Sequence, residues 1–312
     1  MNNRALVSIV LAAAIAFARP IAFIAQEAGK TAQILADARK AIGRLDSLKT
    51  FSVQSNVQHN VGGMQIPSEV EILLELPDKY LRSDVMNAGP GMIIHGGGTM
   101  GFNGNKPIQK MDGAGMPAGG GLQIRVMGPN GPVTSGPAEK PTPEEIEERK
   151  RAMVRSSQTE ASRLMLGWFA MAHPVMKAEY SYAGEAESAD GRAYVIDVKS
   201  TDAFAARLFI DEESHLPLMV TYRAPLPRIV TRTNGGDGGA PADLEKELKT
   251  AAAQPPEMGD YTIYFEEWRD VEGVKFPFKM RRAVSGTTNE EWTVNKVKVN
   301  PKIDPKKFNG DS

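Results

Sequence analysis

The residues of this sequence that could do chemistry are four histidines and a few closely spaced acidic side chains. The histidines are His59, His95, His173 and His215. No two of them have the spacing of a helical zinc site, and the chain has no cysteine to complete one. Three of the four fall in expected turns, loops or a helix end. We therefore interpret them as hydrogen-bonded surface histidines, with a metal site assembled from distant residues as the alternative.

Acidic residues occur in groups that could imitate an acid–base pair. His215 follows Asp211, Glu212 and Glu213, but this segment is more typical of a corner between two strands. Glu266–Glu267 and Glu290–Glu291 are neighbours on expected strands, so their side chains point to opposite faces and cannot share a proton. The sequence also lacks a G-x-S-x-G motif. We therefore expect no enzymatic activity.

The segment Gly96–Gly101 matches the letters G-x-G-x-x-G of a dinucleotide-binding loop. That motif needs a helix directly after it and an acidic residue about twenty positions on. Residues 102–107 instead predict a turn, so we interpret the segment as a glycine loop and expect no cofactor.

Composition narrows the class of protein. The chain has 312 residues, enough for one large domain or two ordinary ones, and 37 basic side chains against 38 acidic ones. A net charge of -1 argues against a nucleic-acid-binding surface spread over the whole protein. Glycine and proline account for 51 residues, of which 23 lie within 87–143. This excess is local, so the core must come mostly from the rest of the chain.

The amino end is typical of an export signal. Arg4 precedes the apolar run Ala5–Ala18, whose fourteen residues are too few to span a bilayer as a helix. Cleavage after Ala25 leaves a polar start; cleavage after Ala18 and an uncleaved anchor are the alternatives. We expect a signal peptide at 1–25, export to the periplasm, and one mature domain at 26–312 with no stable transmembrane anchor.

Helical and strand periods alternate along the mature chain. An apolar stripe predicts a helix over 31–48, and Thr142, Pro143 and Glu145 predict the capped start of a second helix over 143–172, whose second half is apolar nearly all round. Alternating patterns predict strands at 51–57, 70–76, 80–86, 177–184, 192–200, 204–211, 216–223, 261–268, 274–284 and 289–299.

Two insertions interrupt these elements. Residues 87–143 are expected to form two or three strands joined by long loops, and residues 233–259 a Gly-rich stretch with a short helix near 244–253. The fold class is therefore α+β and mostly antiparallel, with one large sheet and helices on one face.

An apolar concave face needs a cover, and the apolar half of the second helix suits that role. Methionine in such a helix suits ligands of varied shape. From the sequence, this helix is either a movable lid or a fixed plug. The candidate residues of a hydrophobic cavity and its lid are Val70, Ile72, Leu74, Leu164, Met165, Trp168, Phe169, Met171, Ile263, Phe265, Phe276, Phe278 and Trp292.

The carboxyl-terminal motifs carry a resemblance to a known family. Residues 259–277, residues 297–304 and Phe308 resemble the close of outer-membrane lipoprotein-sorting proteins of the LolA/LolB-like superfamily, and 209–222 is similar to their central hairpin. The order of elements matches over almost the whole mature chain. The two insertions are longer than in the compact carriers. Arg82 lies on an element similar to the one with a lid-holding arginine, but no motif aligns it.

The resemblance implies an incomplete, half-open barrel of roughly ten or eleven strands, with helices over its concave face. It also implies a periplasmic, cofactor-free protein that binds and transfers lipoprotein acyl chains or other lipids. An inner- or outer-membrane protein is a further candidate partner. The alternative function on the same scaffold is an envelope sensor resembling RseB, which binds a protein partner.

Overall fold

The computed structural model describes the chain in segments separated by gaps. These segments are residues 21–61, 63–87, 95–113, 123–125, 127–128, 131–132, 142–189, 191–201, 203–226, 229–231 and 255–309. The apolar run at the amino end, Ala18 and the short helix expected near 244–253 lie outside the described residues. Cleavage after Ala25 stays a prediction.

Twelve antiparallel strands form one open sheet in the order β5-β4-β3-β2-β1-β16-β15-β14-β12-β11-β10-β9. Their bounds are β1 Thr50–Val61, β2 Met64–Glu75, β3 Lys79–Asn87, β4 His95–Asn103, β5 Lys106–Gly113, β9 Glu179–Ser188, β10 Gly191–Lys199, β11 Ala205–Asp211, β12 Pro217–Pro225, β14 Met258–Val271, β15 Val274–Val284 and β16 Thr287–Val299. Four short strands form two separate pairs: β6 Gln123–Arg125 with β13 Ile229–Thr231, and β7 Met127–Gly128 with β8 Gly131–Pro132.

Within the described segments, the remaining elements are two α-helices and three turns of 3₁₀ helix. Their bounds are α1 Ile21–Ile42, η1 Leu45–Ser47, α2 Pro143–Phe169, η2 Pro174–Met176 and η3 Pro305–Phe308. No helix within the described segments is both long enough and apolar enough to cross a membrane.

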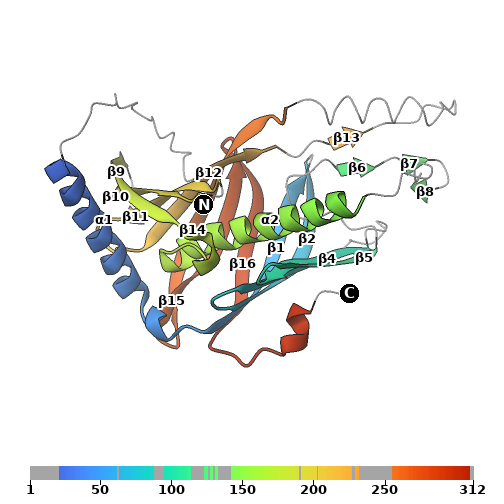
Figure 1. Cartoon of the computed structure of the whole chain (residues 1–312), viewed down its shortest axis with the longest axis horizontal. Coiled ribbons are helices and arrows are strands. Elements are labelled where there is room, and N and C mark those ends of the chain that lie inside the picture. The colour runs from blue at the N-terminus through green and yellow to red at the C-terminus, as the bar shows by residue number, and fades with distance from the viewer. Residues whose placement is uncertain are drawn as a thin grey trace, which may run out of the picture.

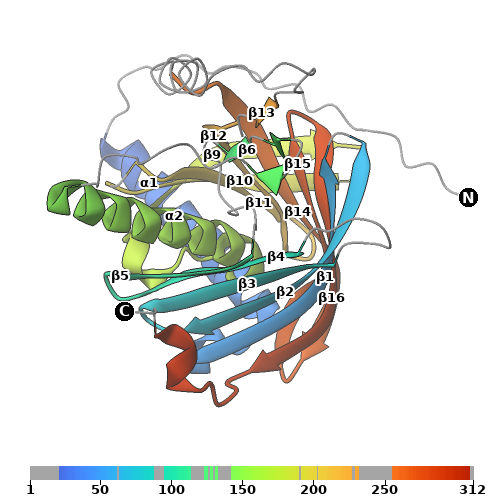
Figure 2. The ribbon, with the colours of Figure 1, turned by 90° about the vertical axis from the view of Figure 1, so that its right-hand side faces the viewer.

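The order of the strands explains why α2 crosses the open side of the sheet. The first and last long strands, β1 and β16, pair with each other in the middle, whereas β5 and β9 form the two edges. In the sequence, α2 lies between β5 and β9, so it connects one edge of the sheet to the other. Figures 1 and 2 show the curved sheet with α2 running across its concave side.

Strand periodicity determines which side chains reach that concave side. In β14, Tyr261, Ile263 and Phe265 are buried and alternate with partly exposed residues. Register pairs Val53 of β1 with Ile72 of β2 and with Val297 of β16, so buried residues of neighbouring strands line up on one face. Antiparallel sheets with one dry face have this pattern.

Helix α1 covers part of the β9 edge. Ile34, Leu35, Ala38 and Ile42 form its buried stripe. The backbone N–H of Tyr182, on the edge strand, donates to Thr31 Oγ1 at 2.9 Å. The Thr31 hydroxyl thus satisfies one backbone N–H of the edge strand, which would otherwise be available for pairing with a strand of another chain. The helix begins at Ile21, earlier than the expected residue 31.

The fold class predicted from the sequence is confirmed: the structure is α+β with an open, half-barrel-like antiparallel sheet and helices on its concave side. The sheet has twelve strands rather than ten or eleven because both β4 and β5 join it. One expectation was wrong, since Gly96–Gly101 is not a loop but part of β4. Pairing with β3 on one side and β5 on the other overrides the low strand propensity of glycine.

Candidate functional site

The candidate site is the contact between α2 and the concave face of the sheet. The predicted capping box starts the helix: the Glu145 N–H donates to Thr142 Oγ1, and the Thr142 N–H donates to the Glu145 side chain. The helix ends where Ala170 adopts a left-handed conformation, with φ 50° and ψ 35°. Arg39 of α1 donates two hydrogen bonds to the Ala170 carbonyl, which joins the two helices at this end.

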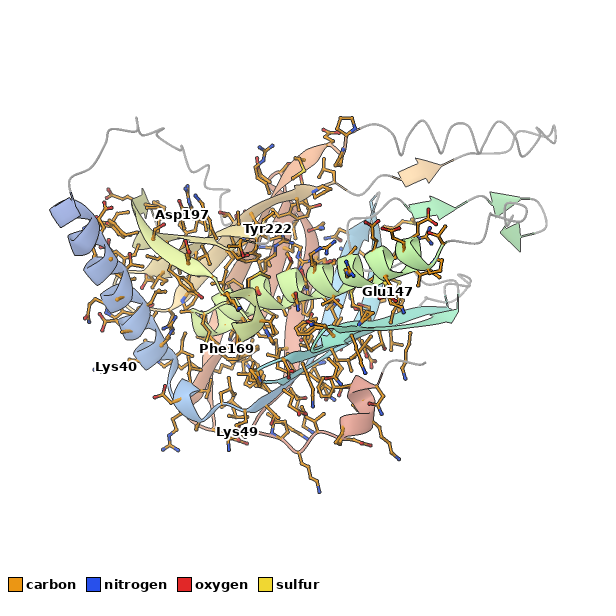
Figure 3. The ribbon with its side chains drawn as sticks, viewed as in Figure 1. Lys40, Lys49, Glu147, Phe169, Asp197 and Tyr222 are labelled. Atoms are coloured by element: carbon orange, nitrogen blue, oxygen red, sulfur yellow. The ribbon has the colours of Figure 1, made fainter. Side chains whose placement is uncertain are left out.

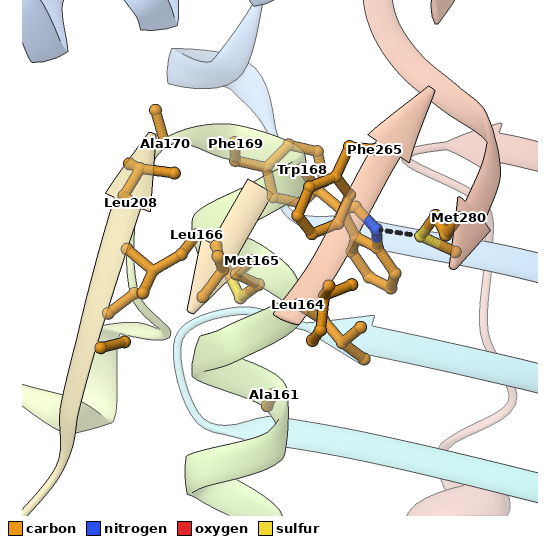
Figure 4. Close-up of a cluster of buried hydrophobic side chains, with 14 of the residues drawn as sticks. Ala161, Leu164, Met165, Leu166, Trp168, Phe169, Ala170, Leu208, Phe265 and Met280 are labelled. Carbon is orange, nitrogen blue, oxygen red and sulfur yellow. Dashed lines mark hydrogen bonds between the residues drawn. The ribbon is translucent and has the colours of Figure 1, made fainter. Parts of the chain in front are cut away.

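The apolar half of α2 is packed into the sheet. Its buried side chains are Leu164, Met165, Leu166, Trp168 and Phe169, and Figure 4 shows them near Leu208 of β11, Phe265 of β14 and Met280 of β15. At Gly167 the helix comes so close to β14 that a Cβ atom would overlap the Phe265 ring. At this position, the packing of α2 against β14 leaves no room for even one methyl group.

Trp168 occupies the centre of this contact and is fully buried. Its ring lies 5.1 Å from Phe276 and 6.4 Å from Phe51, centroid to centroid. Its indole Nε1 donates to Met280 Sδ at 3.1 Å, drawn as the dashed line in Figure 4. Phe169 meets Phe51 edge to face at 5.1 Å. In this structure, aromatic side chains fill the concavity.

The structure brings the thirteen predicted cavity and lid residues together in one hydrophobic cluster. Eleven of them are buried, and Met171 and Phe278 are partly buried against the cluster. These residues therefore lie together in space. Their role in binding a ligand stays a prediction.

Sequence reasoning missed a set of buried and half-buried charges under the middle of α2. We call it the charge cluster: Arg82, Asp84, Glu160, Arg282 and Glu290. Arg82 of β3 donates two hydrogen bonds to Asp84, at 2.8 and 2.9 Å. Arg82 Nη1 and Arg282 Nη2 both donate to Glu160 Oε1, at 3.2 and 2.6 Å. Because Glu160 belongs to α2, this single carboxylate ties the helix to both halves of the sheet: to β3 in the half formed by β1–β5, and to β15 in the half that runs from β16 to β9.

Glu160 is ionised despite its position. Burial disfavours its charge, but Arg282 and Arg82 outweigh that effect and lower the pKa of Glu160 to about 2. The pKa of Glu290 is also lowered, with burial opposing and Arg282 favouring the charge. Glu290 accepts a hydrogen bond from Trp292 Nε1 at 3.1 Å. The cluster is therefore a network of ion pairs, with two guanidinium groups and three carboxylates, at the border of an apolar core.

Arg163, one turn after Glu160, is a further, half-buried cation. Its guanidinium carbon lies 3.7 Å from the centre of the Tyr222 ring, and Tyr222 stacks on Tyr261 at 5.1 Å and 6°. Burial lowers the pKa of Arg163. Figure 3 shows Tyr222 beside the middle of α2 and Phe169 at its C-terminal end.

Two histidines differ from the sequence interpretation as surface residues. His173, just after α2, is buried against Phe102 with both ring nitrogens unpaired. Burial lowers its pKa to about 4, partly opposed by the Lys79 backbone. His59 is half-buried on β1, and its Nε2 lies 2.8 Å from Ser68 Oγ. The expectation was wrong for His173 because the chain folds back under β4 directly after the helix. His215 lies in the expected corner after Asp211.

The other chemical candidates remain apart. Glu290 faces the charge cluster while Glu291 is exposed, as expected for neighbours on a strand. Among the described residues, no three His, Asp or Glu side chains gather in a way that could hold a metal ion.

No protein-family model and no curated protein matches the chain. Among solved structures, it is similar to a LolA superfamily protein from Nitrosomonas europaea, at 11% identity and a TM-score of 0.47, over 89% of this chain and 97% of that one. A Vibrio parahaemolyticus domain named for outer membrane lipoprotein sorting is 10% identical, with a TM-score of 0.47, over 90% and 97%. A DUF1329 family protein from Desulfovibrio piger is 9% identical, with a TM-score of 0.48, over 89% and 95%.

An open antiparallel sheet with helices on its concave side is the architecture that the carboxyl-terminal resemblance predicts. With identities near one tenth, the function must be argued from the residues of this chain.

Proposed function

We propose that this protein is a periplasmic binding and transfer protein for the acyl chains of lipoproteins or other lipids, without enzymatic activity. The observation that carries the proposal is the way α2 covers the concave face. Its apolar half contacts both halves of an open sheet, and one carboxylate, Glu160, ties it there. A cover of this kind separates from the sheet as one unit, whereas the sheet keeps its own hydrogen bonds.

Energetic considerations support the exchange of side chains for a ligand. Removing Trp168 and Phe169 from their packed positions costs roughly 3–5 kcal/mol each. An acyl chain of about fifteen methylenes contributes roughly 12 kcal/mol on entering an apolar site, at about 0.8 kcal/mol per methylene. The two amounts are of the same order, so an acyl chain can compete for the concave face once α2 moves away.

The experiment that tests the proposal ties α2 to the sheet covalently. The chain has no cysteine, so Glu160→Cys with Arg282→Cys gives two unique thiols where an ion pair stood. A short bis-maleimide joins them across the space of the two lost side chains. A fluorescent fatty acid reports ligand uptake before and after cross-linking.

We expect uptake by the double variant to be lost on cross-linking. The matched control is Glu71→Cys with Lys307→Cys, which replaces an exposed ion pair of 2.7 Å away from α2. Cross-linking this control should leave uptake unchanged. Equal uptake with and without the α2 cross-link would contradict a binding site under α2.

A further inference from the structure

Arg163 differs from the other two arginines at this site because it lacks a carboxylate. Arg82 pairs with Asp84 and Arg282 with Glu160. Among the described residues, Arg163 forms no hydrogen bond or ion pair, and its Nε is buried without a partner. A buried N–H group without a partner is costly, because burial removes the water that would satisfy it.

The surroundings hold Arg163 in place. Tyr222 lies under its guanidinium, and Tyr261 stacks on Tyr222 with nearly parallel rings. The Tyr261 hydroxyl donates to the Pro225 carbonyl at 3.1 Å, and this hydrogen bond fixes the Tyr261 ring against Tyr222. Contact with a ring face stabilises the cation but uses none of its five N–H donors. The donors are therefore positioned in advance for an acceptor.

The carboxylate nearest to Arg163 in the helix is already engaged. Glu160 lies three residues before Arg163, and its Oε1 accepts hydrogen bonds from Arg82 and Arg282. These two arginines also pair with Asp84 and Glu290, so Glu160 shares them with two other carboxylates. Guanidinium pairs best with carboxylate or phosphate, whose two oxygens match its two parallel N–H groups.

Arg163 also marks the boundary between the two parts of α2. The buried apolar run begins at the next residue, Leu164, and the charge cluster lies on the other side. We propose that Arg163, held ready by Tyr222 and Tyr261 while α2 lies on the sheet, binds the anionic head group of a single-chain lipid whose acyl chain takes the concave face as α2 moves away. This inference rests on the proposed function and narrows its ligand to lipids with a carboxylate or phosphate.

The test compares ligands of one chain length that differ only in the head group. Myristic acid and tetradecanol compete with the neutral fluorescent probe N-phenyl-1-naphthylamine for binding to the full chain. Myristoyl lysophosphatidic acid and myristoyl lysophosphatidylcholine then distinguish a free phosphate from a zwitterionic head group. We expect the acid to bind about tenfold to a hundredfold tighter than the alcohol, as for hydrogen bonds to charged groups.

Variants assign that preference to one side chain. Arg163→Gln should bind acid and alcohol with equal affinity. Arg163→Lys keeps a charge and should restore part of the preference, and Arg155→Gln, on an exposed position of the same helix, should keep all of it. Thermal unfolding of each variant confirms that it is folded.

Each outcome has a separate meaning. Equal binding of acid and alcohol by the unmodified protein would overturn the head-group site and leave the proposed function standing. Displacement of the probe by neither ligand would overturn both. A preference for the acid that persists in Arg163→Gln would also overturn the assignment to Arg163.

Discussion

Replacing Glu160 with glutamine removes the charge that ties α2 to both halves of the sheet while keeping the size of the side chain. Arg282 and Arg82 lower the pKa of Glu160 from 4.5 to about 2, against the effect of burial. A lowering of this size corresponds to about 3 kcal/mol of stability at neutral pH. We therefore expect Glu160→Gln to reduce the free energy of unfolding by about 3 kcal/mol at pH 7, within the range for broken buried ion pairs.

The pH dependence of this loss has a definite sign. A carboxyl whose pKa is lower in the folded state stabilises the fold fully above its unfolded pKa of 4.5, and that contribution disappears as the pH falls toward 2. The difference between the unmodified protein and Glu160→Gln should thus be constant from pH 7 to about pH 5 and shrink below that.

Urea unfolding followed by tryptophan fluorescence measures this difference at each pH. Glu148→Gln, on the exposed first half of α2, is the control and should change the unfolding free energy little. Equal urea midpoints of the unmodified protein and Glu160→Gln at pH 7 would refute the idea that this carboxylate clamps the helix. A difference that stays undiminished at pH 3 would refute its assignment to an ionised Glu160.

Three further predictions test the packing around α2. His173→Phe should remove an acid-sensitive group, because the pKa of His173 is about 4 in the folded state against 6.5 when free, so that the unfolded state binds the proton first. In urea unfolding, the unfolding free energy of the variant should therefore rise by about 3 kcal/mol relative to the unmodified protein as the pH falls from 7 to 4. A difference that does not change with pH would contradict burial of a neutral ring. Gly167→Ala should lower the midpoint of thermal unfolding, because overlap of the new Cβ with Phe265 costs about 1–3 kcal/mol and the gain in helix propensity is about 1 kcal/mol. Ala152→Gly, at an exposed position of the same helix, is the control for helix propensity. A higher midpoint for Gly167→Ala would show that the Phe265 ring moves freely. Trp168→Ala should lose about 3–5 kcal/mol and recover part of it when myristic acid is added, as measured by thermal shift; no recovery would contradict a ligand in that space.

Much of the fold could be predicted because local patterns and tertiary structure agree. Alternation in 70–76 and 261–268 has only one way to bury its apolar face, and Thr142 with Glu145 forms the expected capping box. The same alternation grouped the thirteen candidate residues, since neighbouring strands present their buried positions to one concave side.

The charge cluster could not be predicted, because its members meet only in the folded chain. Glu160 lies 78 residues from Arg82 and 122 from Arg282 in the sequence. In β3, apolar residues occur on both faces, with Tyr80 on the side of Arg82 and Leu81 on the other. A polar residue in such a strand does not reveal its face, and the one available signal was that Arg82 and Asp84 share the face of Tyr80.

The glycines of β4 were mistaken for a loop for a related reason. Glycine has low intrinsic preference for strands, so its sequence signal is that of a turn. The pairing partners β3 and β5 supply the hydrogen bonds on both sides, and this information is nonlocal.

The most direct test of the central claim is the lipid content of the protein purified gently from a periplasmic extract, measured by native mass spectrometry with identification of the released lipid. If acyl chains occupy the concave face under α2, the protein should carry lipid in a defined stoichiometry, and fluorescent fatty acid should compete with it. A protein that is consistently empty and also fails to bind the fluorescent fatty acid would contradict the account.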